Sequence, residues 1–453
     1  QQRLWFLSQF MGQGAVYNLP MALRLEGNID VDVLIRSLLA LVERHEALRT
    51  RFRAEGDQVV QIIDPPWRDI AVDTVDSARA LADLCQAEQQ HPFDLGNESL
   101  CRLRLVQDTH TSSYVLLVTL HHSIADGWSL GLFVQELVAL YDGFKNGNPA
   151  PLPALALQYA DYAHWQRQWL QGQVLDQQLG YWRRQLAGLP PLLDLPTDRP
   201  RPAAQRFHGR RQAFTLPAAL GQQLQVFSQQ QGVTLYMCLL SAFAVLLSRY
   251  SGQTDVAIGT PIANRTRQEC EKIIGFFVNT LVIRADLGGD PSVGALLTQI
   301  REVALQAYAH QDIPFEQLVE ELNPERSLSY SPLFQVMFAL QNVPMDSVQA
   351  SDMQLSSLAL AEHGVARFDL TLTLYESETG LAGSMEYNSD LFDQASIERL
   401  LGHYTRVLEA MVADPQQAVS TLRFVSAAEQ QQLSHFNTTD LAYPEDTHIT
   451  ALF

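Results

Sequence analysis

The sequence predicts an α/β fold made of two lobes, each with a mixed sheet. Apolar strand patterns and amphipathic helix patterns are mixed along all 453 residues, without the strict rhythm of a parallel sheet. A proline-rich connector over 188–202 separates two such stretches, because proline blocks regular secondary structure. Hydrophobic residues form 47 % of the chain and charged residues 18 %, an ordinary globular composition.

In the first half, the patterns predict helices and strands in turn. The spacing of leucines over 33–48 predicts a helix. Residues 101–106 alternate arginine and leucine, which indicates a half-buried strand, and the apolar run 114–120 indicates a strand buried on both faces. A second helix runs from Leu130 to Phe144 and ends near Gly147. A long helical stretch is predicted over 158–187.

The second half is predicted to continue the mixture after the connector. The strand over 366–375 alternates apolar and polar residues, and the helix over 292–309 has a regular apolar face. The other predicted helices cover 218–231, 234–250 and 394–413, and the other strands cover 254–262, 278–286 and 333–341.

Charge and composition exclude several classes of function. A net charge of −19 disfavours non-specific binding to nucleic acid or anionic lipid, and no apolar run approaches the ~18 residues of a membrane span. The two lysines, Lys145 and Lys272, do not lie in a phosphate-loop context. Four scattered cysteines form no CxxC, which fits a cytoplasmic protein. The start at Gln1-Gln2 indicates a piece of a longer polypeptide.

One dense polar cluster, residues 121–127 (HHSIADG), follows directly after a buried strand. Imidazole is the natural general base near neutral pH, and loops on a rigid sheet present catalytic groups. Successive extended residues point to opposite faces, so we expect one histidine to face a cleft and the other to pack inward. Asp126 either holds the loop or orients a ring, and Gly127 allows a turn that a β-carbon would hinder. A metal site is disfavoured because adjacent histidines diverge and no third ligand is evident.

The cluster resembles the HHxxxDG signature of condensation domains from non-ribosomal peptide synthetases. The wider acyltransferase superfamily shares only the HxxxD part of this signature. Further segments resemble other motifs of that family in the same order. These segments are QQRLWFL at 1–7, YNLP at 17–20, RHEALRT at 44–50, YADYAHWQ at 159–166, IGFFVNT at 274–280, HQDIPF at 310–315 and SPLFQ at 331–335.

The resemblance implies two chloramphenicol-acetyltransferase-like lobes in a V-shaped pseudo-dimer, with the active site at their junction. It implies an N-terminal lobe over 1–175, a C-terminal lobe over 176–435 and the start of a linker to an adenylation domain over 436–453. The implied reaction forms an amide by attack of a carrier-bound aminoacyl amine on an upstream carrier-bound thioester. Both substrates arrive on phosphopantetheine arms, and the domain binds no cofactor of its own.

Carried over residue by residue, the resemblance makes His122 the functional histidine, as a proton acceptor or as a group that orients the amine. The backbone N–H of Gly127 is a candidate oxyanion donor. His121 and Asp126 are structural, with Asp126 pairing to Arg265. Candidates for lining the site are Trp128, for which packing is the stronger expectation, and Ser129, Asn279 and Gln335.

The implied partners are the upstream donor carrier, the downstream acceptor carrier and an adjacent adenylation domain, with a monomer inside a multidomain chain. An L,L-type condensation domain is the leading interpretation. A dual epimerisation/condensation domain is the alternative, favoured by the glycine-containing stretch before Tyr17. Three alternatives are weaker. The intact signature disfavours a non-catalytic recruitment module, and the opening motif disfavours a D-donor subtype. The complete motif series and the tail that resembles an adenylation linker disfavour a free coenzyme-A acyltransferase.

Overall fold

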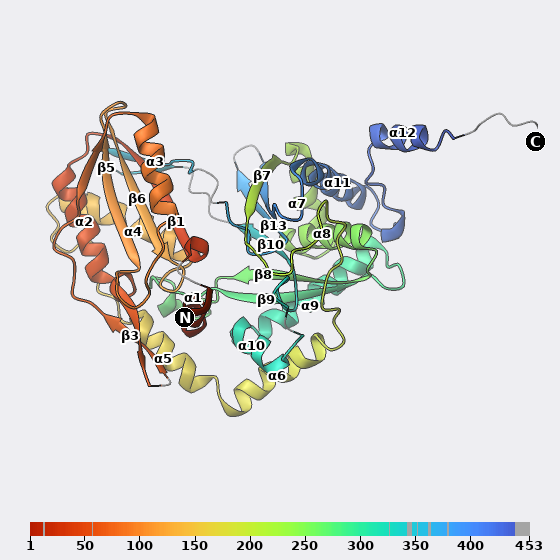
Figure 1. The fold of residues 1–453 in the computed structure, drawn as a ribbon, viewed down its shortest axis with the longest axis horizontal. Helices are drawn as coiled ribbons and strands as arrows, with labels where there is room; N and C mark the ends of the chain where they lie inside the picture. The colour runs from red at the N-terminus through yellow and green to blue at the C-terminus, as the bar shows by residue number, and fades with distance from the viewer. Residues whose placement is uncertain are drawn as a thin grey trace, which may run out of the picture.

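Two six-stranded sheets occupy separate halves of the molecule (Figure 1). The computed structural model describes residues 1–11, 14–56, 58–325, 327–341, 347–350, 352–360, 364–377 and 380–439. The first sheet has the order β11 (Ser347–Gln349), β12 (Met353–Ser357), β1 (Asn18–Gly27), β6 (Ser113–His121), β5 (Cys101–Asp108), β4 (Val72–Val75). The second has the order β7 (Gly209–Thr215), β14 (Gly380–Asn388), β13 (Leu370–Ser377), β10 (Val336–Gln341), β8 (Asp255–Ile262), β9 (Asn279–Asp286). The predicted α/β class is confirmed.

The first sheet is covered on both faces because β6 is apolar on both. Leu116 and Val118 pack into a core shared with α2 (Val31–Arg44) and α4 (Gly127–Lys145), whereas Val115 and Leu117 pack toward α3 (Ala78–Gln89). β6 pairs antiparallel with β1 and β5 along nearly its whole length. A separate hairpin of β2 (Thr50–Glu55) and β3 (Gln58–Ile63) lies beside this half.

The core of the second half is built around α8 (Leu235–Ser251), whose residues 237–247 are all buried. It contacts β8 and the helices α7 (Ala218–Gln230), α9 (Val293–Ala309) and α11 (Gln394–Ala413), each of which also contacts a strand of the sheet. The connector over 188–202 has no regular structure, yet it is fixed to this core: Leu193 and Leu195 are buried in it, and Arg201 forms an ion pair with the buried Asp369.

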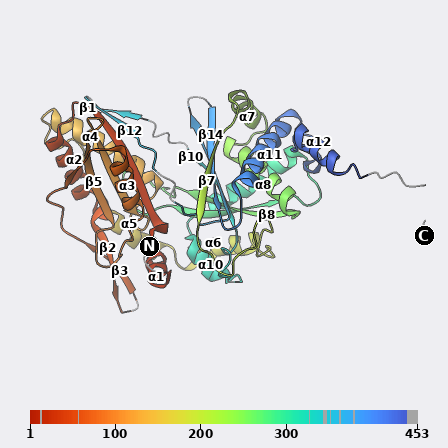
Figure 2. The same cartoon turned by 45° about the horizontal axis from the view of Figure 1, so that its top comes forward.

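Three segments join the halves. β12 follows β10 in sequence but pairs with β1, with Leu25 opposite Leu355, and Figure 2 shows it beside the first sheet. The helices α5 (Tyr159–Trp169) and α6 (Gly172–Gln185) run from one half to the other (Figure 1). Residues 270–278, between β8 and β9, place Ile273, Ile274 and Phe277 in the core of the first half.

The structure differs from the sequence expectations at several boundaries. The predicted helix over 158–187 is two helices, because the chain turns at Gln171 and Gly172 has a left-handed φ of 52°. The helix expected to reach residue 48 ends at Arg44, where His45 becomes extended. The division at 175/176 does not separate the sheets fully, since β11 and β12 complete the first one.

The remaining helices are α1 (Gln2–Met11), α10 (Phe315–Leu322) and α12 (Ala427–Phe436), and α12 projects from the body of the second half (Figures 1 and 2). Residues 440–453, most of the expected linker, lie outside the described residues, as do Gly12 and Gln13 of the glycine-containing stretch. Among the described helices, none alone is long and apolar enough to cross a membrane; α7 and α8 meet that test only as a pair bent by 104°.

Candidate active site

The HHSIADG cluster forms the short loop between β6, which ends at His121, and α4, which begins at Gly127. Asp126 is the N-cap of α4 and accepts a hydrogen bond from the Ser129 amide at 2.9 Å. The other end of the loop is held by Tyr17, directly before β1, because the His122 amide donates to the Tyr17 carbonyl at 2.8 Å. The loop is therefore anchored on β6, on α4 and on the turn that leads into β1.

His122 has a defined tautomer. Its Nδ1 lies 2.9 Å from the Ala125 carbonyl oxygen, and a carbonyl only accepts, so Nδ1 carries the hydrogen. Within the described residues no hydrogen bond is made to Nε2, which therefore presents a lone pair when the ring is neutral. The ring lies edge-on to Phe276, with centroids 5.3 Å apart.

The surroundings of His122 favour its neutral form. Burial, followed by the positive charge of Arg367, lowers the pKa of His122 to about 4, although the nearby Asp126 carboxylate acts in the opposite direction. Part of the His122 side chain is accessible to solvent, but protein atoms surround the ring closely. This surrounding protein makes the charged form of the ring less favourable. Near neutral pH, Nε2 of His122 is thus a hydrogen-bond acceptor with little tendency to hold a proton.

His121 points inward, as expected, and is 3 % exposed. Its Nδ1 accepts from the Ser123 amide at 3.2 Å and lies 2.8 Å from the Ser123 hydroxyl. Burial, with smaller effects of His122 and Arg367, lowers the pKa of His121 to about 3. One histidine of the pair faces outward and the other packs into the fold, which confirms the alternation argument.

Asp126 joins the two halves of the molecule through an ion pair with Arg265. Arg265 Nη2 lies 3.2 Å from Asp126 Oδ1, and both side chains are 2 % exposed. Asp126 Oδ2 accepts from the amides of Phe277 and Val278 at 3.0 and 3.1 Å. Both carboxylate oxygens are therefore engaged with backbone and arginine donors. The sequence left two roles open for Asp126, holding the loop or orienting a ring. The structure shows that it holds the loop, and within the described part of the chain it makes no bond to a histidine ring.

We call residues 274–278 the strap, because this segment of the second half is bonded to the first half at several points. The Gly275 amide donates to the Ser129 hydroxyl at 3.1 Å, and the Tyr159 hydroxyl donates to the Phe276 carbonyl at 2.8 Å. The Ile274 amide donates to Nδ1 of the buried His45 at 3.3 Å. His45 belongs to the RHEALRT motif, which serves as an anchor for the strap.

Gly127 and Trp128 differ from expectation. Gly127 does not have a left-handed φ, and a β-carbon there would meet nothing within 4 Å, so the turn argument was wrong. Its amide is at the first position of α4 and has no acceptor among the described residues. Trp128 is 46 % exposed rather than packed in a core, and its Nε1 donates to the Glu271 carbonyl at 3.1 Å.

The other lining candidates are internal anchors. Ser129 is fully buried, with its hydroxyl 2.7 Å from Asp126 Oδ1 and 3.0 Å from Arg265 Nη2. Asn279 donates to the Gln311 and Ile313 carbonyls, both at 2.8 Å. Gln335 fixes the connector, since its Oε1 accepts from the Leu193 amide at 2.8 Å. The side chains of Ser129, Asn279 and Gln335 therefore form hydrogen bonds inside the protein, and they hold the segments around the loop in place.

Sequence reasoning missed Arg367 as a member of the site. It donates through Nε and Nη2 to the Val16 carbonyl and lies 4.7 Å over the Tyr17 ring. Its place on the polar side of the alternating strand pattern over 366–375 gave no signal that separated it from Asp369 or Thr371. Among the described residues, no group of three or more His, Cys, Asp and Glu side chains is arranged to hold a metal ion.

Comparison with known proteins identifies the family to which the chain belongs. The family model described as Condensation domain matches residues 1–434, so the chain belongs to the condensation-domain family of non-ribosomal peptide synthetases, whose members form amide bonds. A linear gramicidin synthase polypeptide of Brevibacillus parabrevis is 48 % identical over 99 % of this chain. The chain covers only 6 % of that relative.

Solved structures share the fold. A complex of an X-domain with OxyB from teicoplanin biosynthesis superposes with a TM-score of 0.85, at 30 % identity over 94 % of each chain. A four-domain nonribosomal peptide synthetase bound to AMP and glycine matches 95 % of this chain, and 34 % of its own, with a TM-score of 0.84. At 24 % identity, that second likeness concerns the fold alone.

Proposed function

We propose that this chain forms an amide bond between two carrier-bound thioesters, with His122 as the residue that receives the attacking amine. The observation that carries this proposal is the bond from His122 Nδ1–H to the Ala125 carbonyl, which leaves Nε2 as the outward acceptor of a neutral ring. The donor is an aminoacyl or peptidyl thioester on an upstream carrier, and the acceptor is an aminoacyl thioester on a downstream carrier.

The lowered pKa of His122 defines what the ring does. A group whose pKa is about 4 is too weak a base to deprotonate an ammonium ion near neutral pH. The amine therefore reacts in its neutral form, and Nε2 accepts one of its N–H hydrogens, which aims the nitrogen lone pair at the thioester carbonyl carbon. Nε2 takes the proton only after the C–N bond has formed, when the nitrogen becomes positively charged.

Groups on the same loop also take part in the later steps of the reaction. Negative charge on the carbonyl oxygen of the tetrahedral intermediate is stabilised by the Gly127 N–H at the start of α4. The C–S bond then breaks, the donor's phosphopantetheine leaves as a thiol with the proton held by His122, and the amide remains on the acceptor carrier. The domain needs no cofactor of its own for these steps, because a thioester is already activated.

This proposal includes partners beyond the chain. The two carrier domains and a following adenylation domain are its expected neighbours, with residues 436–453 as the start of the linker. The two lobes are residues 1–175 and 176–435, except that β11 and β12 complete the sheet of the first lobe. The domain acts as a monomer within its longer polypeptide. The four cysteines are buried and free, which supports a cytoplasmic location.

The direct test replaces His122→Ala in the full 453-residue chain and measures amide formation between two loaded carriers. We expect the loss of most condensation at an unchanged thermal unfolding temperature. The matched control is His110→Ala, since His110 is an exposed histidine on a turn of the same half. A near-normal rate in the His122 variant would exclude this role.

The subtype is decided by product stereochemistry. An upstream carrier loaded with an L-terminated peptide gives an L residue at the former donor position if the domain is of the L,L type, which we propose. A D residue there establishes the dual epimerisation/condensation alternative, in which His122 also moves an α-proton. A non-catalytic recruitment module is the alternative of another class, and it predicts no product with either carrier pair.

A further inference from the structure

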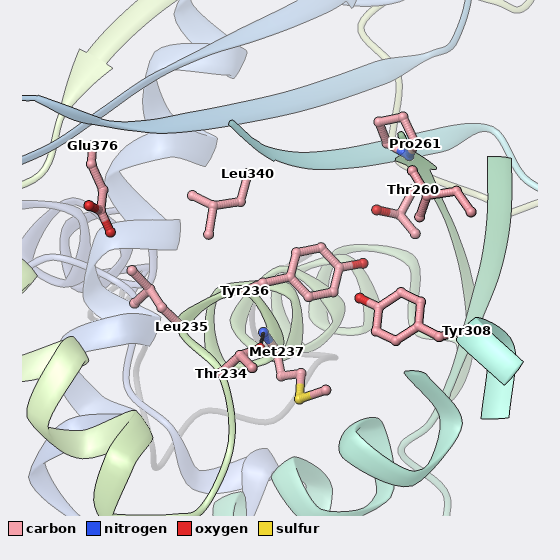
Figure 3. A pocket seen from close by; sticks show the side chains of 10 residues that line it. Thr234, Leu235, Tyr236, Met237, Thr260, Pro261, Tyr308, Leu340 and Glu376 are labelled. Atoms are coloured by element: carbon pink, nitrogen blue, oxygen red, sulfur yellow. Dashed lines mark hydrogen bonds between the residues drawn. The ribbon is translucent and has the colours of Figure 1, made fainter. Parts of the chain in front are cut away.

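A cavity of about 450 Å³ lies in the second half, on the helix-covered side of its sheet (Figure 3). Its walls come from the first turn of α8, the end of β8, the end of α9 and the ends of β10 and β13. Its volume falls in the ~300–1,000 Å³ range of small-molecule sites in proteins. The proposed chemistry at His122 uses none of its residues.

The cavity adjoins the segment that anchors the active-site loop. Thr260 and Ile262 line it at the carboxyl end of β8, where Ile262 pairs with Asn279 at the start of β9. Three residues beyond Ile262 is Arg265, the partner of Asp126, and directly before Asn279 is the strap. The cavity therefore opens from the same end of the second sheet that reaches the HHSIADG loop.

The lining is mixed, because the carboxylate of Glu376 and the hydroxyls of Thr234 and Thr260 lie among the apolar side chains. Met237 and Leu340 supply apolar surface, whereas Tyr236 and Tyr308 turn their hydroxyls toward the end near Thr260 (Figure 3). The Tyr236 hydroxyl is buried beside the Thr260 side chain, and it makes no hydrogen bond of good geometry within the described part of the chain. A hydroxyl both donates and accepts, so it keeps capacity for a hydrogen-bonding group on a ligand.

We infer that this cavity binds the side chain of one of the carrier-bound aminoacyl substrates and selects for a large side chain with a polar tip, such as a phenol. This inference rests on the proposed function, because an amide-forming domain must hold two aminoacyl groups beside its catalytic loop. The Tyr236 hydroxyl meets the polar tip, and Met237 and Leu340 contact the ring or chain behind it.

The experiment fills the cavity with Leu340→Trp and compares kcat/KM for glycyl, phenylalanyl and tyrosyl groups, loaded in turn on the upstream and the downstream carrier. We expect a loss of ~10-fold or more for the two aromatic groups in one of the two positions, and no loss for glycyl. The position that shows the loss identifies the cavity as the donor or the acceptor pocket. Tyr236→Phe should lower the rate for tyrosyl relative to phenylalanyl, since it removes only the hydroxyl.

The control variant is Val226→Trp, because Val226 is 54 % exposed on α7, away from the cavity lining. A readout without turnover is the ¹³C-methyl signal of Met237, which N-acetyl-tyrosinamide should shift in the unmodified chain and not in Leu340→Trp. If that signal does not respond and the aromatic rates are unchanged, the inference is wrong while the amide-forming function stands. If no carrier pair gives product but the Met237 signal responds, the proposed function fails and the pocket remains.

Discussion

Arg367, just before β13, donates two hydrogen bonds to the carbonyl oxygen of Val16, from Nη2 at 2.8 Å and Nε at 3.1 Å. The guanidinium also lies over the ring of Tyr17. The Tyr17 carbonyl in turn accepts a hydrogen bond from the His122 amide. A cation of the second half is thereby fixed beside the histidine of the first half. Burial lowers the pKa of Arg367 itself, yet an arginine remains charged at every working pH.

This relationship predicts that Arg367→Gln raises the pKa of His122. The positive charge of Arg367 disfavours a second positive charge on the ring, and its removal makes protonation easier. We expect the midpoint of the His122 titration to move from about 4 toward the usual 6.5, and condensation at pH 6 to fall as the protonated fraction grows. NMR titration of the labelled imidazole measures the midpoint directly.

The control for this prediction is Arg367→Lys, which keeps the charge and should leave the midpoint of His122 low. The His122 signal is assigned by its loss in His122→Ala. An unchanged midpoint in Arg367→Gln would mean that burial alone sets the pKa, and that Arg367 acts only as an anchor for Val16.

Gly127→Pro isolates the proposed oxyanion donor. Proline is well suited to the first position of a helix, and the extended Asp126 before it is compatible with a following proline. The substitution removes the Gly127 N–H, which makes no hydrogen bond within the described residues, so the fold should remain. We expect a loss of ~10²–10³ in kcat, the usual effect of removing one oxyanion donor.

Gly127→Ala is the matched control, because it keeps the N–H and its β-carbon meets nothing within 4 Å. Its kcat should stay within a few fold of the unmodified chain, with an equal unfolding temperature. An equal loss of kcat in the alanine and proline variants would mean that the added side-chain atoms at the start of α4 cause the loss, and not the missing N–H donor.

The local patterns predicted the elements that carry the loop, and they failed where the partner is distant in sequence. β6 and α4 were predicted because an apolar run and a helical repeat are local signals. The inward turn of His121 followed from strand alternation. By contrast, β12 has an ordinary sequence, and its pairing with β1 depends on contacts more than 300 residues apart.

The same limit explains the errors at the site. The inventory of His122, Asp126 and Arg265 came from motif resemblance, and the structure places Asp126 and Arg265 in contact. Asn279 and Gln335 were expected to line the site, but polar side chains near a site also serve to hold its loops, and only coordinates separate the two roles. Arg367 lies 245 positions after His122, which no spacing rule connects.

Asp126→Ala should destabilise the fold as well as reduce activity. It leaves the buried Arg265 without its counter-charge and the amides of Phe277 and Val278 without an acceptor. We expect the free energy of unfolding to fall by ~3–5 kcal/mol, the usual cost of breaking a buried pair from one side. Urea unfolding of the variant measures this change.

A surface pair is the control for Asp126. Arg53 and Glu55 form an ion pair with side chains that are 57 % and 51 % exposed, so Glu55→Ala should change the unfolding free energy by less than ~1 kcal/mol. Asp126→Ala combined with Arg265→Met should cost less than the sum of the two single changes, since the two residues share one interaction. Strict additivity would contradict the pairing.

Gly275→Ala tests whether the strap positions the active-site loop. A β-carbon at Gly275 would lie 2.1 Å from the Tyr159 ring, so that ring must move and strain its hydrogen bond to the Phe276 carbonyl. We expect a loss of ~1–3 kcal/mol in stability, the usual range for overpacking, together with reduced condensation. Gly131→Ala, within α4, meets nothing within 4 Å and should instead stabilise the helix by ~0.5–1 kcal/mol with activity retained. If Gly275→Ala lowers stability but leaves kcat unchanged, the strap holds the halves together without setting the geometry of His122.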